Sequence, residues 1–228
     1  MNIYAIGDIH GCLNHLERLL DKVQPDLNRD RLLFMGDYID RGPRPKGVVD
    51  YILRLQRLYP TENIICLKGN HEAMFANFLQ GQEINMFLFN GGLSTLKDYW
   101  GPECGRQERL VLPPDHEEFY RGLKTIYETT DYIFVHGGLL PGVSLAEQRE
   151  ENLLWIRGEF IASKENFGRK VIFGHVPFRQ PLIMPNKIGI DTAAVYGNFL
   201  TCIQLPQEEF FFVGKHNESL SAKEYSSL

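Results

Sequence analysis

The chain has 228 residues, of which 43% are hydrophobic and 23% charged, and its formal net charge at pH 7 is -5. This length fits one α/β domain, so we expect a single domain over residues 1–214 and a flexible tail over the polar residues 215–228. The acidic balance argues against nucleic acid as a partner, because phosphates would require a basic surface. No apolar run is long enough for a membrane helix, no leader is evident and the four cysteines form no close pair, so we expect a cytoplasmic protein without a membrane partner.

Strands and helices alternate along the first 70 residues. Residues 2–6 predict a strand, and apolar residues at helical spacing from Leu13 to Val23 predict a helix that Asn14 and Glu17 are expected to cap. Residues 32–35 predict a second strand, and the apolar stripe over residues 48–58 predicts a helix that Pro60 ends. Residues 64–67 predict the next strand.

The middle of the chain is predicted to be mainly helical and the second half rich in strands. Residues 71–124 are helical in pattern, interrupted by a proline-containing loop at 101–114 that we expect to shape the substrate entrance. His116 is expected at the surface. Further strands are predicted at residues 132–135, 171–173, 182–184, 187–190, 199–205 and 209–213.

Five short polar clusters each follow a predicted strand, where ligands of α/β sheets usually bind. Each cluster also has an ordinary reading, such as a solvated turn, a helix cap or a structural histidine. Together, their carboxylates, imidazoles and amide oxygen suit Mn²⁺, Fe or Zn²⁺ better than Mg²⁺ or Ca²⁺. The clusters are Asp8-Ile9-His10-Gly11, Gly36-Asp37-Tyr38-Ile39-Asp40-Arg41-Gly42, Gly69-Asn70-His71-Glu72, His136-Gly137-Gly138 and Gly174-His175.

In this order the five clusters resemble the phosphoprotein phosphatase family of the calcineurin-like metallophosphoesterases, over about residues 3–213. The resemblance implies an α/β fold, a calcineurin-like metallophosphoesterase sandwich with central mixed β-sheets flanked by α-helices. Gly174-His175 lacks the second histidine of the GHxH motif, which favours the phosphoprotein phosphatase branch over the nucleases. Gly137 and Ala193 also depart from the usual pattern, but neither is a ligand position.

The resemblance also implies a role for each site residue. Asp8 and His10 match ligands of a first metal, Asp37 the carboxylate that bridges two metals, and Asn70, His136 and His175 the ligands of a second metal. Two divalent ions, expected to be Mn²⁺ with Fe or Zn²⁺ as alternatives, would supply a bridging hydroxide for in-line attack on phosphorus. His71 matches the general acid and Asp40 the group that orients it.

The phosphate group would be bound by Arg41, Arg157 and Asn70. Arg157 has an alternative reading as a helix-surface arginine paired with Glu159. The resemblance therefore implies a serine/threonine protein phosphatase that acts on a phosphorylated protein or peptide. Whether it also accepts phosphotyrosine is left open.

Two alternatives stay open. A diadenosine tetraphosphate hydrolase shares the same motifs, and residues 190–201 resemble that group. A dinucleoside polyphosphate is therefore the alternative substrate. The compact chain favours the protein phosphatase. A non-catalytic scaffold that binds phosphoproteins is more remote, because every ligand position is filled. The native metal and the oligomeric state are left open.

Overall fold

A computed structural model describes residues 1–104 and 110–214. The predicted tail and residues 105–109 of the predicted loop lie outside the described residues. The strands are β1 (Ile3–Ile6), β2 (Arg31–Phe34), β3 (Ile64–Cys66), β4 (Ile126–Glu128), β5 (Tyr132–Val135), β6 (Lys170–Phe173), β7 (Leu182–Ile183), β8 (Lys187–Gly189), β9 (Leu200–Leu205) and β10 (Glu209–Val213). The α-helices are α1 (Leu13–Val23), α2 (Pro45–Leu58), α3 (Asn70–Leu79), α4 (Ile84–Phe87), α5 (Leu93–Trp100), α6 (Pro114–Arg121), α7 (Glu150–Trp155) and α8 (Gly158–Ala162). Shorter helical turns are η1 (Thr61–Asn63), η2 (Leu88–Gly92), η4 (Leu145–Glu147) and η5 (Ala194–Tyr196).

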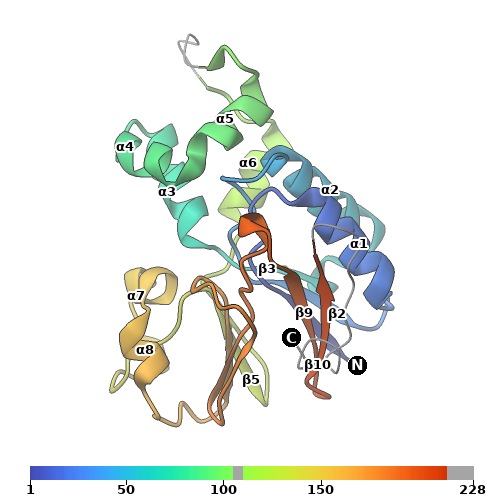
Figure 1. Cartoon of the computed structure of the whole chain (residues 1–228), viewed down its shortest axis with the longest axis vertical. Helices are drawn as coiled ribbons and strands as arrows, with labels where there is room; N and C mark the ends of the chain where they lie inside the picture. The colour runs from blue at the N-terminus through green and yellow to red at the C-terminus, as the bar shows by residue number, and fades with distance from the viewer. Residues whose placement is uncertain (105–109, 215–228) are drawn as a thin grey trace.

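The strands form two five-stranded mixed sheets. The first has the order β10-β9-β1-β2-β3 and the second the order β4-β5-β6-β8-β7. Helices α1 and α2 lie along the first sheet, α7 and α8 lie beside the second, and α3 to α6 extend beyond one end of the sandwich (Figure 1). The predicted α/β sandwich with mixed sheets is therefore confirmed.

Both faces of the central strands are buried, because successive side chains point alternately into two different hydrophobic cores. In β1, Ile3 and Ala5 belong to the core between the two sheets, whereas Tyr4 and Ile6 belong to the core under the helices. In β5, Phe134 faces the first sheet, while its neighbours Ile133 and Val135 pack with the α8 side. Because successive strand side chains point to opposite faces, strands covered on both sides are continuous apolar runs, and this is why they were predictable.

Three details differ from the sequence expectations. Helix α1 begins at Leu13 after Cys12, and its N-cap makes no side-chain hydrogen bond, so the predicted cap at Asn14 is wrong. Strand β4 was not predicted, because it is half exposed and is defined by its antiparallel pairing with β5. His116 is buried rather than exposed, and its ring bonds to Tyr99 and Asp50.

None of the helices in the described ranges is long and apolar enough to cross a membrane.

Candidate active site

The predicted site residues meet where the parallel strands of both sheets end. Strands β1, β2 and β3 run parallel to one another, as do β5, β6 and β8. The carboxyl ends of parallel strands lie at one edge, so the side chains that follow them converge. A buried polar residue follows each strand: Asp8 after β1, Asp37 after β2, Asn70 after β3, His136 after β5, His175 after β6 and Asp191 after β8.

The backbone of this region is held in a costly conformation. Left-handed φ angles occur at His10 (44°), Asp37 (53°), Asp40 (69°), Arg41 (67°) and His175 (63°). For an L-residue this conformation costs roughly 1–2 kcal/mol. Close approach of the loops adds a further constraint, since a Cβ at Gly69 would collide with the carboxylate of Asp37. Such strain clusters where side chains must be aimed for function.

Asp37 stands at the centre of the site. Its Oδ2 atom is 3.4 Å from Nε2 of His10 and 3.9 Å from Nε2 of His71, whereas its Oδ1 atom is 3.3 Å from Nε2 of His136. Potential ligand atoms therefore form two groups, one of His10, Asp37 and His71 and one of Asp37, His136 and His175. Each oxygen of Asp37 faces one group, as a carboxylate shared by two cations would require.

Asn70 belongs to the second group. Its Oδ1 atom is 2.9 Å from Nε2 of His136 and 2.9 Å from Nδ1 of His175. A neutral amide oxygen between two imidazoles offers a further donor atom without adding charge.

His10 and His136 are oriented with their Nε2 atoms toward Asp37. Nδ1 of His10 lies 2.8 Å from the carbonyl of Ile39, and Nδ1 of His136 lies 2.9 Å from the carbonyl of Met35. When Nδ1–H donates to these carbonyls, Nε2 carries the lone pair that a metal needs, which is the usual outer support of a metal-binding histidine. Burial lowers the pKa of His10 to about 3 and that of His175 to about 3, so both rings are neutral at pH 7.

Asp8 lies in the same buried region but belongs to neither group. Its Oδ2 atom accepts the backbone N–H of His175 at 3.0 Å. Burial, together with the nearby carboxylates of Asp191 and Asp37, raises the pKa of Asp8 well above its usual value. Several carboxylates buried close together need cations to balance them, so the donor set fits divalent metal ions.

His71 forms a second arrangement with Asp40 and Thr95. Nδ1 of His71 lies 2.6 Å from Oδ2 of Asp40, and the hydroxyl of Thr95 donates to Oδ1 of Asp40 at 2.5 Å. Burial opposes the charged imidazolium, but the carboxylates of Asp37 and Asp40 outweigh it and raise the pKa of His71. The ring is therefore held in place, and its protonated form is favoured.

Two arginines contact histidines of the site. Nη1 of Arg41 is 2.5 Å from Nε2 of His10, and Nε of Arg157 donates to Nε2 of His175 at 2.9 Å. Arg157 lies between α7 and α8, at the N-cap of α8. The structure thus places one predicted phosphate-binding arginine beside each group of ligand atoms.

Sequence reasoning assigned no role to three buried residues of the site. Glu72 accepts the backbone N–H groups of Asp37, Tyr38 and Gly69, each at 2.9 Å, and so braces the loops after β2 and β3. Its place three residues after Gly69 is a helix-capping signal. Asp191 follows a parallel strand as the other candidates do, so the same rule could have found it, whereas nothing in the sequence marks Thr95.

Comparison with known proteins relates this geometry to a family. Residues 1–198 match the family model described as calcineurin-like phosphoesterase. The bis(5'-nucleosyl)-tetraphosphatase PrpE (asymmetrical) of Oceanobacillus iheyensis is 25% identical, with 98% of this chain and 96% of the relative covered. The protein of the same name from Halalkalibacterium halodurans is 23% identical, with 98% of each covered.

Solved structures show the same fold. A proposed diadenosine tetraphosphatase superposes with a TM-score of 0.75 at 24% identity, covering 95% of each chain. A protein serine/threonine phosphatase from Saccharomyces cerevisiae superposes with a TM-score of 0.66 at 19% identity, covering 97% of this chain and 80% of the other. With the site geometry and a family match that spans most of its length, the chain belongs to the calcineurin-like phosphoesterase family.

Proposed function

We propose that the protein hydrolyses phosphoric esters or anhydrides with two divalent cations held at Asp37, and that a dinucleoside polyphosphate is its substrate. The observation that carries the chemistry is that the two oxygens of Asp37 face two separate groups of ligand atoms. His10 and Asp8 would serve one cation, and Asn70, with the two histidines that follow β5 and β6, the other. Bound there, divalent cations, with Mn²⁺ as our choice, would lower the pKa of a water molecule and neutralise the phosphoryl oxygens.

In this proposal His71 protonates the oxygen that leaves phosphorus. Its Nδ1–H is engaged by Asp40, so Nε2–H is the group free to donate. Asp40 is a positioning residue, and the hydroxyl of Thr95, which also accepts the backbone N–H of Asp40 at 2.9 Å, fixes that carboxylate. General acids of this kind contribute about 10²–10⁴-fold to the rate.

Arg41 and Arg157 would bind the phosphoryl oxygens. Both guanidinium groups reach the ligand histidines, so they border the space where a phosphate would lie. A guanidinium offers five donors in a planar fork that matches phosphate oxygens. Asn70 can add its amide N–H groups to the same phosphate.

The relatives favour a dinucleoside polyphosphate over a phosphoprotein. Chain length does not favour the phosphatase, contrary to the sequence expectation, because the chain covers 96% and 98% of two relatives that are named bis(5'-nucleosyl)-tetraphosphatase. The metal chemistry serves both substrates equally. We therefore put the dinucleotide first.

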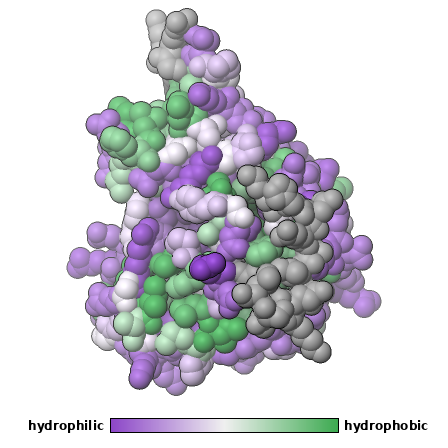
Figure 2. Space-filling model, in the orientation of Figure 1, coloured by the Kyte–Doolittle hydropathy of each residue, from purple (hydrophilic) through white to green (hydrophobic). Residues whose placement is uncertain are grey.

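A phosphoprotein is the second candidate, and one surface feature favours it. Exposed apolar side chains of α4, η2 and α5 form a patch on the upper left of Figure 2, and η2 contacts the site, since the carbonyl of Gly91 accepts the backbone N–H of Arg41 at 3.1 Å. A peptide bound at Arg41 would lie near these side chains. They are Ile84, Met86, Leu88, Phe89 and Leu93.

One measurement ranks the two candidates. Turnover of diadenosine tetraphosphate and of a phosphoserine peptide is compared at equal Mn²⁺ concentration, with Asp37→Asn as the control for contaminating activity. We expect kcat/KM for the dinucleotide to be higher by orders of magnitude, and no activity in the Asp37 variant. A preference for the peptide would select the second candidate, and wild-type protein that is inert on both substrates with Mn²⁺, Fe²⁺ or Zn²⁺ would overturn the enzymatic proposal.

A further inference from the structure

A pocket rich in arginine opens beside the candidate active site. It has a volume of about 820 Å³ and lies between the start of α1, the loop at residues 41–44 and the turn that carries η5. Three of its lining residues are Arg18, Arg41 and Arg44, and among the described residues that line it none is an aspartate or glutamate. We call it the arginine pocket. In a protein with a net charge of -5, this concentration of cations marks a place for an anion.

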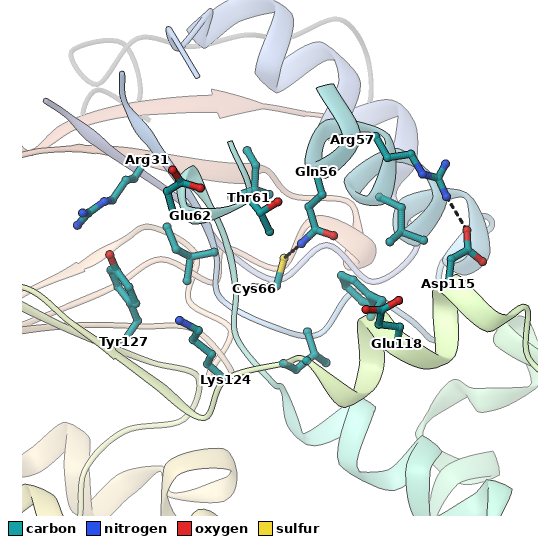
Figure 3. Close-up of a pocket in the computed structure, with 16 residues that line it drawn as sticks. Arg31, Gln56, Arg57, Thr61, Glu62, Cys66, Asp115, Glu118, Lys124 and Tyr127 are labelled. Carbon is teal, nitrogen blue, oxygen red and sulfur yellow. Dashed lines mark hydrogen bonds and ion pairs between the residues drawn. The ribbon is translucent and has the colours of Figure 1, made fainter. Parts of the chain in front are cut away.

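A second pocket of the molecule shows the contrast. It has a volume of about 660 Å³ and lies between α2, α6 and β4 (Figure 3). Its basic residues are interleaved with acidic ones, and Arg57 forms an ion pair of 2.6 Å with Asp115. Lys124 and Glu118 also line it. A pocket with balanced charge does not select an anion. The arginine pocket therefore differs from the pocket of Figure 3 in its charge rather than in its size.

The arginine pocket is continuous with the candidate active site through Arg41. Nη1 of Arg41 reaches His10, while the same residue lines the pocket. Arg18 uses one donor on the carbonyl of Gly214, and Nε of Arg44 is 3.8 Å from Oδ1 of Asp98, a long and partly exposed ion pair that contributes little. A chain of phosphates that starts at Arg41 would therefore meet two further guanidinium groups.

Tyr196 supplies the other half of a nucleotide site. Its side chain is 65% exposed and lines the pocket, and Cζ of Arg41 is 5.6 Å from the centre of its ring. The turn that carries it is tied to the metal region, since the backbone N–H of Ala193 donates to Asp191 at 2.9 Å. An exposed aromatic ring held in this way offers a surface for a nucleobase, because every base has a π face.

We propose that the arginine pocket binds the nucleotide arm that extends from the scissile phosphate, with its phosphates on Arg18 and Arg44 and its base stacked on Tyr196. This inference rests on the proposed dinucleoside polyphosphate substrate and names the residues that would select it. A simple aryl phosphate has no such arm and gains nothing from the pocket.

The test compares diadenosine tetraphosphate with para-nitrophenyl phosphate at saturating Mn²⁺ in the full-length protein. We expect Tyr196→Ala to raise KM for the dinucleotide about tenfold more than for the aryl phosphate, as loss of a stacked base predicts. Tyr196→Phe keeps the ring and should restore KM. Arg44→Ala should raise KM for the dinucleotide as well, and its effect should shrink at high salt.

Arg57→Ala is the matched control, because it removes an exposed arginine from the pocket of Figure 3. It should leave both substrates unaffected. If Tyr196→Ala raised KM equally for both substrates, Tyr196 would only support the turn. If KM for the dinucleotide were unchanged in Tyr196→Ala and Arg44→Ala, the proposal would be overturned.

A second measurement separates this inference from the proposed function. If the wild-type enzyme cleaves the aryl phosphate but not the dinucleotide, the proposed substrate is wrong, and ATP is then tested as a competitive inhibitor of aryl phosphate hydrolysis in excess Mn²⁺. Weaker inhibition in Tyr196→Ala and Arg44→Ala than in wild type would still support a nucleotide pocket. Absence of inhibition, or equal inhibition of all variants, would exclude it.

Discussion

At the scale of single residues, the protonation of His71 is controlled by the carboxylates around it. Its imidazole is 1% exposed and lies between the carboxylates of Asp40 and Asp37. A buried imidazolium is costly unless it is paired, and these two carboxylates supply the pairing. The upward shift in the pKa of His71 therefore depends on these two carboxylates, and removing one of them should reverse part of the shift.

Asp40→Asn tests this dependence. Loss of the carboxylate charge lowers the pKa of His71, so the imidazole loses its proton at a lower pH. A general acid must be protonated to act, and the alkaline limb of the pH–rate profile should therefore move to lower pH. The measurement is kcat against pH with saturating Mn²⁺ and phenyl phosphate, whose leaving group needs a proton.

The matched variant for this test is Thr95→Val, which keeps the charge of Asp40 but removes the hydroxyl that donates to it. It should move the limb less than Asp40→Asn does. A limb that stays in place in the Asp40 variant would show that another group is the acid.

The sequence predicts some of these residues far better than others. Asp37, His136 and His175 could be found because each follows an apolar strand, and parallel strands bring their ends together. Thr95 could not, because it is 55 positions from Asp40 and its packing depends on how α5 docks. The local sequence pattern thus identifies the site residues that follow a strand, but not the residues that other elements contribute to the site.

At the scale of elements, the short helix α8 depends on a buried lysine. Lys187 is fully buried, and its Nζ donates to the carbonyl of Phe160 and, at 2.9 Å, to that of Ser163. Nζ also lies 4.1 Å from the centre of the Phe160 ring. A helix of five residues cannot be stable alone, so this cation at its C-terminal end helps to fix it against the second sheet.

Lys187→Met should therefore destabilise the protein. It removes the charged donor from the carbonyls of Phe160 and Ser163, and a hydrogen bond to a charged group contributes about 1.5–3 kcal/mol. Urea unfolding at constant metal concentration gives the free energy of unfolding. Lys170→Met is the control, since Lys170 forms a partly exposed pair with Glu208 at 2.5 Å and such pairs contribute little. Equal effects of the two variants would contradict the role given to Lys187.

Elements that bury both faces were the easiest to predict. The strands from β1 to β3 and from β5 to β10 all lie within one or two residues of their predicted places. The predicted cap at Asn14 failed because the turn at Gly11 and Cys12 places the helix start one residue earlier. His116 was misjudged because its polar partners, Tyr99 and Asp50, come from α5 and α2, and the sequence pattern around residue 116 does not reveal them.

At the scale of the whole molecule, the site buries several carboxyl groups whose ionisation the fold disfavours. Burial, followed by repulsion from neighbouring carboxylates, raises the pKa of Asp8, and burial raises that of Asp191 to about 6 and that of Glu72 to about 8. A carboxyl group whose pKa is raised in the folded state disfavours folding as it ionises. Cations bound at Asp37 would relieve this cost, so metal binding and stability should be linked.

The pH range in which stability changes follows from the direction in which folding shifts each pKa. The unfolded carboxyl groups lose their protons near pH 4, so each raised folded pKa makes stability fall as pH rises above that value. Below about pH 6.5 the buried neutral histidines act in the opposite direction, because their lowered pKa values make stability rise with pH. Above about pH 6.5 that effect is complete, and the raised pKa values of Glu72 and His71 make stability fall.

Metal-free protein should therefore lose thermal stability between pH 6.5 and 8, and Mn²⁺ should raise Tm more at pH 8 than at pH 6.5. At a hundredfold excess over Kd, binding contributes about 2.7 kcal/mol, which for a domain of this size is about 5–10 °C in Tm. Thermal unfolding with chelator and with Mn²⁺ at both pH values measures the difference. Asp37→Asn, which removes the carboxylate shared by both groups of ligand atoms, should respond least. A Tm that Mn²⁺ leaves unchanged at both pH values would mean that the buried carboxylates are balanced within the protein, and the two-cation site would have to be abandoned.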